Sequence, residues 1–263
     1  MDEPSRPPPR SRGIYLLPNL LTTGGMFSGF YAILAAASGH FETACIAVFV
    51  AALFDGVDGR IARLTGTSTQ FGVQYDSLAD LVSFGMAPAL VMYHWALSTL
   101  KLDGVPMGKA GWSAAFLYMA CAALRLARFN AQVGVVDKRW FIGLASPAAA
   151  AVVVSFVWTM DHLGYSGEQL RYVALAVTVI AGLLMVSRLR YTSFKGGRSN
   201  PSPPGERVPF VLLLVVVLTI VALYIYPSVL LLAVTWLYAL SGPALWAWNR
   251  LRRKPPASPT EAT

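Results

Sequence analysis

The chain has 263 residues, of which 56% are hydrophobic and 13% are charged, and its mean hydropathy is positive. This composition excludes an ordinary soluble domain and indicates a membrane protein. A net charge of +8 would suggest a nucleic-acid partner in a soluble protein, but here the basic residues lie at the ends of apolar stretches. We therefore expect them to set the membrane topology and to contact lipid headgroups, with no nucleic acid as a partner.

The apolar stretches predict an all-α polytopic membrane protein with about eight transmembrane helices. Residues 1–13 are rich in proline and arginine and predict a flexible cytoplasmic tail, residues 14–248 a single transmembrane domain, and residues 249–263 a basic, disordered cytoplasmic tail. The predicted spans, in chain order, are 18–38, 41–63, 71–97, 112–128, 146–160, 169–186, 208–224 and 228–246.

Charge asymmetry supports an orientation with both termini in the cytoplasm. In this layout 18 of the 21 Lys and Arg residues lie on the cytoplasmic side, and only Lys101, Lys109 and Arg171 lie outside. An excess of basic residues in cytoplasmic loops is the usual pattern of membrane proteins. The orientation places the end of the second span and the start of the third near the cytoplasmic face.

Four carboxylates interrupt the apolar sequence within the segment DGVDGRIARLTGTSTQFGVQYDSLAD at 55–80: Asp55, Asp58, Asp76 and Asp80. Removing an unpaired carboxylate from water costs on the order of several kcal/mol. We therefore expect cations to bind these four carboxylates. The first two are three residues apart and the last two four apart, so each pair shares one face of a helix. A hairpin through the polar turn at 65–70 would let the pairs face each other.

Small residues lie beside these carboxylates. Gly59, Ala62 and Gly72 leave a patch without side chains, where a flat group can approach the backbone. Arg63 adds a charge of the kind that grips phosphate. The combination predicts divalent cations that hold a pyrophosphate, with a planar base in the recess.

The spacing of Asp55, Asp58-Gly59, Ala62-Arg63, Gly72, Asp76 and Asp80 resembles the signature of the CDP-alcohol phosphatidyltransferases, with every position filled. The resemblance implies that an alcohol hydroxyl displaces CMP at the phosphorus of a CDP-linked lipid, in a homodimeric enzyme whose single membrane domain is catalytic.

It also implies roles for individual residues. Two divalent cations, Mg or Mn, would be bound by Asp55, Asp58, Asp76 and Asp80, and Asp80 would also be the general base of catalysis. The CDP-binding residues would be Gly59, Ala62, Arg63 and Gly72. Asn19 and Thr22, at the start of the first span, are assigned to the same nucleotide site, although polar residues there are equally typical of a helix cap.

Other stretches resemble the bacterial and archaeal phosphatidylserine synthase branch of the family. They are 18–30, 78–88, and 123–130 followed by 141–150, with Ala145 where that branch usually has proline. The resemblance implies an integral protein of a bacterial or archaeal plasma membrane that uses CDP-diacylglycerol and L-serine to make phosphatidylserine and CMP.

A serine carboxylate needs a cation, and two arginines one turn apart end the fourth predicted span. We assign serine binding to Arg125, Arg128, Asn130 and Ser146. Positive-inside anchoring is an alternative role for these arginines, although one arginine would satisfy it as well as two. A phosphorylated alcohol would also attract both of them.

Two alternatives stay open at this point. A sister transferase could use glycerol phosphate, inositol phosphate or another alcohol. A membrane transporter is the other alternative, because carboxylates inside a membrane also build ion pathways. A transporter predicts carboxylates spread through the depth of the membrane, whereas these four cluster at one end of two adjacent helices.

Overall fold

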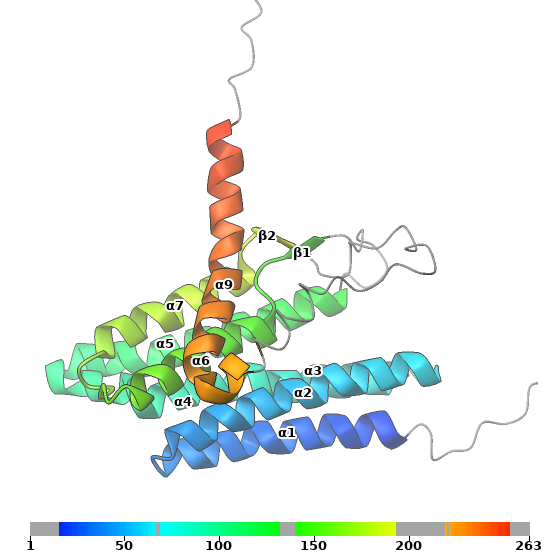
Figure 1. Ribbon diagram of the computed structural model, residues 1–263, viewed down its shortest axis with the longest axis horizontal. Coiled ribbons are helices and arrows are strands. Elements are labelled where there is room, and N and C mark those ends of the chain that lie inside the picture. The colour runs from blue at the N-terminus through cyan, green and yellow to red at the C-terminus, as the bar shows by residue number, and fades with distance from the viewer. Residues whose placement is uncertain (1–15, 67–68, 132–139, 193–218, 220, 253–263) are drawn as a thin grey trace, which may run out of the picture.

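The computed structural model describes residues 16–66, 69–131, 140–192, 219 and 221–252, which form a helical bundle with one short β-ribbon (Figure 1). Three described helices are long and apolar enough to cross a membrane, or four if the bent pair Gln70–Trp95 and Leu97–Asp103 counts as one span. These features confirm the helical fold and agree with a membrane protein.

The elements are α1 (Leu16–Ala37), α2 (Phe41–Thr65), α3 (Gln70–Asp80), the π-helical turn η2 (Leu81–Met86), α4 (Ala87–Trp95), the 3₁₀ helix η3 (Leu97–Asp103), α5 (Val105–Ala131), β1 (Trp140–Ile142), α6 (Ser146–His162), α7 (Arg171–Val186), β2 (Arg190–Thr192) and α9 (Pro227–Arg252).

Helices α1 and α2 form an antiparallel hairpin in which small residues allow close approach. The Ser28 hydroxyl donates to the Ala47 carbonyl over 2.8 Å, and Phe54 lies against Gly24 and Gly25. The buried face of α1 consists almost entirely of small side chains: Thr22, Gly25, Ser28, Gly29, Ala32, Ala35 and Ala36. This packing places the first half of α1 beside the last turns of α2.

The third predicted span is a continuous helix from Gln70 to Trp95, made of α3, η2 and α4. Its start is well defined, because Gly66 ends α2 with a φ of 63° and Thr69 caps α3 by accepting from the Gly72 N–H over 3.0 Å. The connection through the polar turn therefore brings α3 back along α1 and α2.

Residues 98–111 lie between the third and fourth predicted spans, where a loop was expected, but the structure shows that they are mostly helical. Residues 97–103 form η3, and α5 begins at Val105, so Lys109 lies within a helix rather than in a loop. Leu97 and Leu100 are fully buried, and Gly111 packs directly against the Leu97 carbonyl. Burial of these two leucines against α5 explains why the segment folds onto the bundle.

Helix α6 lies at the centre of the bundle, and eleven of its seventeen residues are buried. Its far end is tied to two neighbours by indole N–H groups. Trp158 donates to Glu42 of α2, and Asp161 accepts from Trp95 of α4, each over 3.2 Å.

The short ribbon β1–β2 was not predicted from the sequence. It pairs Phe141 with Tyr191 in antiparallel register, and beyond it the Gly143 N–H donates to Leu189 O over 2.8 Å. Gly143 adopts a φ of 82° and lies against the Met185 carbonyl, so a side chain would not fit there. The ribbon fixes the start of α6 against the end of α7.

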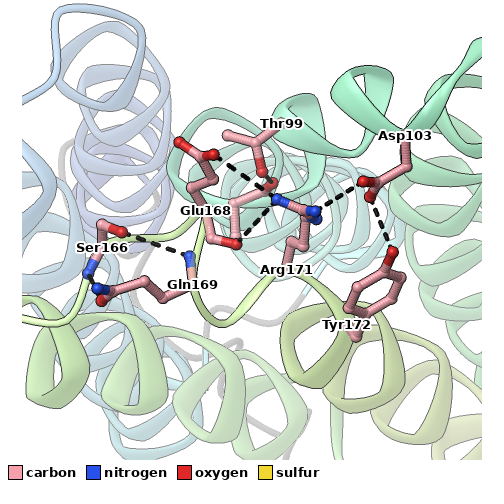
Figure 2. A network of polar contacts seen from close by, with 8 residues as sticks. Thr99, Asp103, Ser166, Glu168, Gln169, Arg171 and Tyr172 are labelled. Atoms are coloured by element: carbon pink, nitrogen blue, oxygen red, sulfur yellow. Dashed lines mark hydrogen bonds and ion pairs between the residues drawn. The ribbon is translucent and has the colours of Figure 1, made fainter.

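Figure 2 shows a polar network that joins η3 to the start of α7. Arg171 forms an ion pair with Asp103 over 2.6 Å, and the Tyr172 hydroxyl donates to the other Asp103 oxygen over 2.9 Å. Just before α7, Ser166 and Gln169 exchange hydrogen bonds between side chain and backbone in the manner of a capping box.

The eighth predicted span corresponds to α9, which crosses the other helices steeply in Figure 1, with its second half projecting away from them. Its first half contacts the middle of α6, where Trp236 donates to the Val152 carbonyl over 3.4 Å. The helix continues to Arg252, beyond the predicted domain end at 248. Most of the seventh predicted span, 208–224, all of the predicted tail 1–13 and most of the predicted tail 249–263 lie outside the described residues, so the eight-span layout stays a prediction.

Candidate functional site

Three of the four carboxylates converge between α2 and α3. Oxygen atoms of Asp55, Asp76 and Asp80 all lie within 4.8 Å of one another. Asp55 lies about three turns before the end of α2, and Asp76 and Asp80 lie one turn apart on α3. The hairpin therefore brings together residues up to 25 positions apart. Such a set of oxygen atoms suits a hard divalent cation.

Asp58 belongs to the same site but is oriented differently. It is 4% exposed, and its Oδ2 accepts from the Thr22 hydroxyl over 2.7 Å. Thr22 also lies 3.0 Å from the Pro18 carbonyl within α1. The hydroxyl of α1 thus holds the carboxylate of α2, and Thr22 is part of the site rather than only a polar residue at a helix start.

A small cavity lies among the carboxylates. Its volume is about 10 Å³, which is about the space of one water molecule or one ion. Among the described residues, none of the four aspartates forms an ion pair with a lysine or arginine. The lining residues are Thr22, Gly25, Met26, Ala51, Asp55, Asp58, Asp76, Ala79, Asp80, Ser83 and Phe84.

A larger cavity of about 150 Å³ adjoins the first and shares Thr22, Asp58 and Asp76 with it. An added Cβ at Gly59 would meet no described atom within 4 Å, so the recess is open at this point. All six residues predicted to bind the nucleotide line this cavity: Asn19, Thr22, Gly59, Ala62, Arg63 and Gly72.

Arg125 lies near the end of α5 and lines neither of the two cavities. Its guanidinium donates to the Ser146 hydroxyl over 2.6 Å, and it interacts electrostatically with Asp80. Within the described part of the chain, its Nε is buried and has no hydrogen-bond partner. A buried donor without a partner is costly, so this atom marks an unsatisfied donor in the interior near Asp80.

The other two residues assigned to serine lie apart from this contact. The Asn130 amide donates to the Ser77 hydroxyl of α3 over 2.9 Å. Arg128 is half-buried, and its side chain forms no hydrogen bond or ion pair with any other described residue. The structure therefore joins Arg125 to Ser146 and joins Asn130 to α3.

Several residues that shape the site were missed in the sequence. Ser83 follows Asp80 by three residues and donates to the Gly25 carbonyl of α1 over 3.2 Å. Tyr75 forms a hydrogen bond with Thr23 over 2.8 Å. Tyr118 of α5 donates to the Phe84 carbonyl over 3.2 Å. The sequence offered one signal, and only for the contact of Tyr118. Pro88 has no N–H that could donate to the Phe84 carbonyl, four residues earlier.

Comparison with known proteins gives a consistent result. The family model of the CDP-alcohol phosphatidyltransferases matches residues 15–184. The CDP-diacylglycerol–serine O-phosphatidyltransferase of Helicobacter pylori strain 26695 is 38% identical over 187 residues, which cover 71% of this chain and 76% of that protein. The protein of the same name from Mycobacterium leprae is 31% identical over 237 residues, 87% of this chain and 75% of that one. The archaetidylserine synthase of Methanothermobacter thermautotrophicus is 36% identical over 182 residues, 68% and 71% of the two chains.

Proposed function

The chain belongs to the CDP-alcohol phosphatidyltransferase family, and we propose that its site transfers the phosphatidyl group of CDP-diacylglycerol to the hydroxyl of L-serine. The products are phosphatidylserine and CMP. The observation that carries the proposal is the convergence of three carboxylates next to a recess lined by every residue of the nucleotide assignment. Relatives named as serine transferases cover most of the chain and support the choice of acceptor.

The donor set fits divalent cations. Asp55, Asp76 and Asp80 offer oxygen atoms close enough to share one ion, and Asp58 lines the same small cavity. We assign these four residues to two cations, Mg or Mn. When bound, the cations would neutralise the pyrophosphate and the charge that develops on the departing CMP.

The larger recess is assigned to the CMP half of the donor. Gly59, Ala62 and Gly72 leave room for the flat base, and Arg63 at the rim pairs with phosphate. Thr22 holds Asp58 in place between the recess and the carboxylate cluster. The acyl chains stay in the lipid, because only the headgroup has to enter the polar cavity.

In the proposed reaction the oxygen of the serine hydroxyl forms a bond to the phosphorus that carries the diacylglycerol. Asp80 accepts the proton of this hydroxyl at the same time. The bond from this phosphorus to the CMP oxygen breaks, and CMP leaves with the electron pair. Arg125 binds the serine carboxylate through its Nε, which has no hydrogen-bond partner among the described residues, while Ser146 fixes the guanidinium. Arg128 and Asn130 complete the proposed serine site.

The wider setting is also part of the proposal. Residues 14–248 form one transmembrane catalytic domain with eight spans, both termini are cytoplasmic, and the aspartates lie near the cytoplasmic face, where CMP can leave. The charge bias of the loops supports this orientation. We also propose a homodimer, testable by the mass of the purified protein in detergent.

One assay tests the reaction directly. Purified protein is supplied with CDP-diacylglycerol, Mg or Mn, and in turn L-serine, glycerol phosphate, inositol phosphate and inositol, and lipid products are identified by mass. We expect phosphatidylserine with stoichiometric CMP. A phosphatidyl product made with another alcohol, and none with serine, would contradict the serine assignment while leaving the reaction class intact.

A further inference from the structure

The helix that carries Asp80 changes its winding immediately after this residue. Residues Leu81–Met86 form a π-helical turn, and the Ala87 N–H donates to the Val82 carbonyl five positions earlier. Turns of this kind are rare and are frequent at functional sites. Because each residue of an α-helix turns the chain by about 100°, one extra residue in a turn changes where the preceding side chains point relative to α4. The direction of Asp80 therefore depends on this turn.

One carbonyl of the turn cannot form an α-helical hydrogen bond. In an α-helix the Phe84 carbonyl would accept from residue 88, but Pro88 has no N–H. The Tyr118 hydroxyl of α5 donates to this carbonyl over 3.2 Å, and Tyr118 is fully buried. A backbone carbonyl in an apolar environment needs such a partner.

The turn is also held on its other sides. Ser83 donates to the Gly25 carbonyl, and Gly29 lies so close that an added Cβ would fall 2.7 Å from the Ser83 Cα. On the α5 side, Gly85 lies against Ala122. Because both α1 and α5 contact η2, a change in either contact would displace the backbone that follows Asp80.

Tyr118 also belongs to the helix that carries Arg125. The two residues are seven positions apart, which places them on the same face of α5 two turns from each other. Helix α5 thus supplies Arg125 directly and holds the turn after Asp80 through Tyr118. Gly182 of α7 packs against the Tyr118 backbone, because a Cβ added at Gly182 would lie only 3.3 Å from the Tyr118 Cα.

We propose that Tyr118 is a positioning residue of the reaction, whose hydroxyl holds the π-helical turn in the form that directs Asp80 at the acceptor bound by Arg125. The inference rests on the proposed role of Asp80 as the base. Tyr118 itself touches no substrate in this scheme, and it acts only through the Phe84 carbonyl.

The experiment compares Tyr118→Phe with a matched variant, Tyr191→Phe. Both tyrosines are fully buried, and both donate to a backbone carbonyl; the Tyr191 bond to Ala239 measures 3.1 Å. Each substitution removes one buried hydroxyl and leaves the ring, so the structural losses are alike and both proteins should fold. The readouts are kcat, KM for serine, KM for CDP-diacylglycerol and the melting temperature.

We expect Tyr118→Phe to lower kcat by about tenfold or more, as misplacement of a proton acceptor does, with KM for CDP-diacylglycerol within about twofold of the parent value. Tyr191→Phe should lower the melting temperature to a similar extent and leave kcat near the parent value. Equal kcat in the two variants, at comparable melting temperatures, would overturn the inference.

A third variant separates this inference from the function it rests on. Asp80→Asn should cut turnover far more steeply than Tyr118→Phe while CMP still binds. Normal turnover of Asp80→Asn would refute the base and with it the role of Tyr118. Loss of turnover in Asp80→Asn, with Tyr118→Phe no slower than Tyr191→Phe, would keep the base and refute the positioning role alone.

Discussion

The Arg125 guanidinium donates to the Ser146 hydroxyl over 2.6 Å and so joins the last turns of α5 to the first turn of α6. Ser146 is fully buried, and the Nε of the arginine is buried without a partner among the described residues. The side chain is therefore fixed by one donor group and leaves another available. This arrangement suits the binding of a carboxylate better than attraction to a membrane surface, where the charge alone would be sufficient.

Arg125→Lys should weaken serine binding, because lysine keeps the charge but cannot donate to Ser146 and to a carboxylate with the same fixed geometry. A charge-assisted hydrogen bond contributes about 1.5 to 3 kcal/mol, so KM for serine should rise about ten- to a hundredfold. KM for CDP-diacylglycerol should hardly change. Arg128→Lys, at a half-buried position one turn away, tests whether the second arginine shares this role. Higher KM for CDP-diacylglycerol in both variants, with unchanged serine dependence, would assign the arginines to the lipid phosphate.

Removal of divalent metal should abolish activity, and added Mg or Mn should restore it, because Asp55, Asp76 and Asp80 converge and form no ion pair with a basic residue in the described part of the chain. Asp55→Asn and Asp76→Asn should require higher metal concentrations for half-maximal activity. The measurement is turnover against free metal concentration. Full turnover in excess chelator, in protein shown to be free of metal, would refute the metal site.

Gly59→Leu should block the nucleotide recess. An added Cβ at Gly59 meets no described atom within 4 Å, so the side chain enters the cavity without straining the protein. We expect the Kd for CMP to rise by at least about tenfold, or about 1.4 kcal/mol. Gly56 is the matched control: it lies one turn earlier on α2, an added Cβ there also meets no described atom, and it lines neither cavity. Equal CMP affinity in Gly59→Leu and Gly56→Leu would remove the nucleotide from this recess.

The proposed orientation can be tested by labelling single cysteines in intact cells. Gln70 at the start of α3 and Lys101 in η3, which follows the other end of the α3–α4 helix, both have exposed side chains. A thiol reagent that cannot cross the membrane should label Lys101→Cys and reach Gln70→Cys only after the cells are opened. The native Cys45 and Cys121 are buried and give the background. The reverse labelling pattern would invert the topology.

The polar network in Figure 2 should contribute to stability and not to catalysis. Arg171→Ala removes the partner of Asp103, to which Tyr172 also donates, so the contact between η3 and α7 is weakened. We expect a lower melting temperature in detergent, a smaller difference at high salt, and an unchanged KM for serine. Lys109→Ala, an exposed basic residue in α5, is the control. A shift in substrate affinity without loss of stability would contradict a purely structural role.

The sequence determined the helical fold and the chemistry of the site. Long apolar stretches cannot leave their backbone groups unpaired in lipid, so they form helices, and the helix period then places Asp55 and Asp58, or Asp76 and Asp80, on one face. Four of the six residues assigned to the nucleotide follow from the same local spacing on the two sides of one hairpin. The other two, Asn19 and Thr22, were assigned from the polar start of the first span, and all six line the recess. Element boundaries were less certain, since the leucines of η3 form a buried helix only because α5 offers them a surface.

Only the tertiary structure decided which distant residues meet. Three contacts join residues that are 21 to 36 positions apart in the chain and lie on different helices. They are Thr22 with Asp58, Tyr118 with the Phe84 carbonyl, and Arg125 with Ser146. No local period predicts them, because each depends on how far one helix is shifted and rotated along another. The small residues of α1 and the π-helical turn set that shift, and with it the side on which Thr22 and Asp80 face the site.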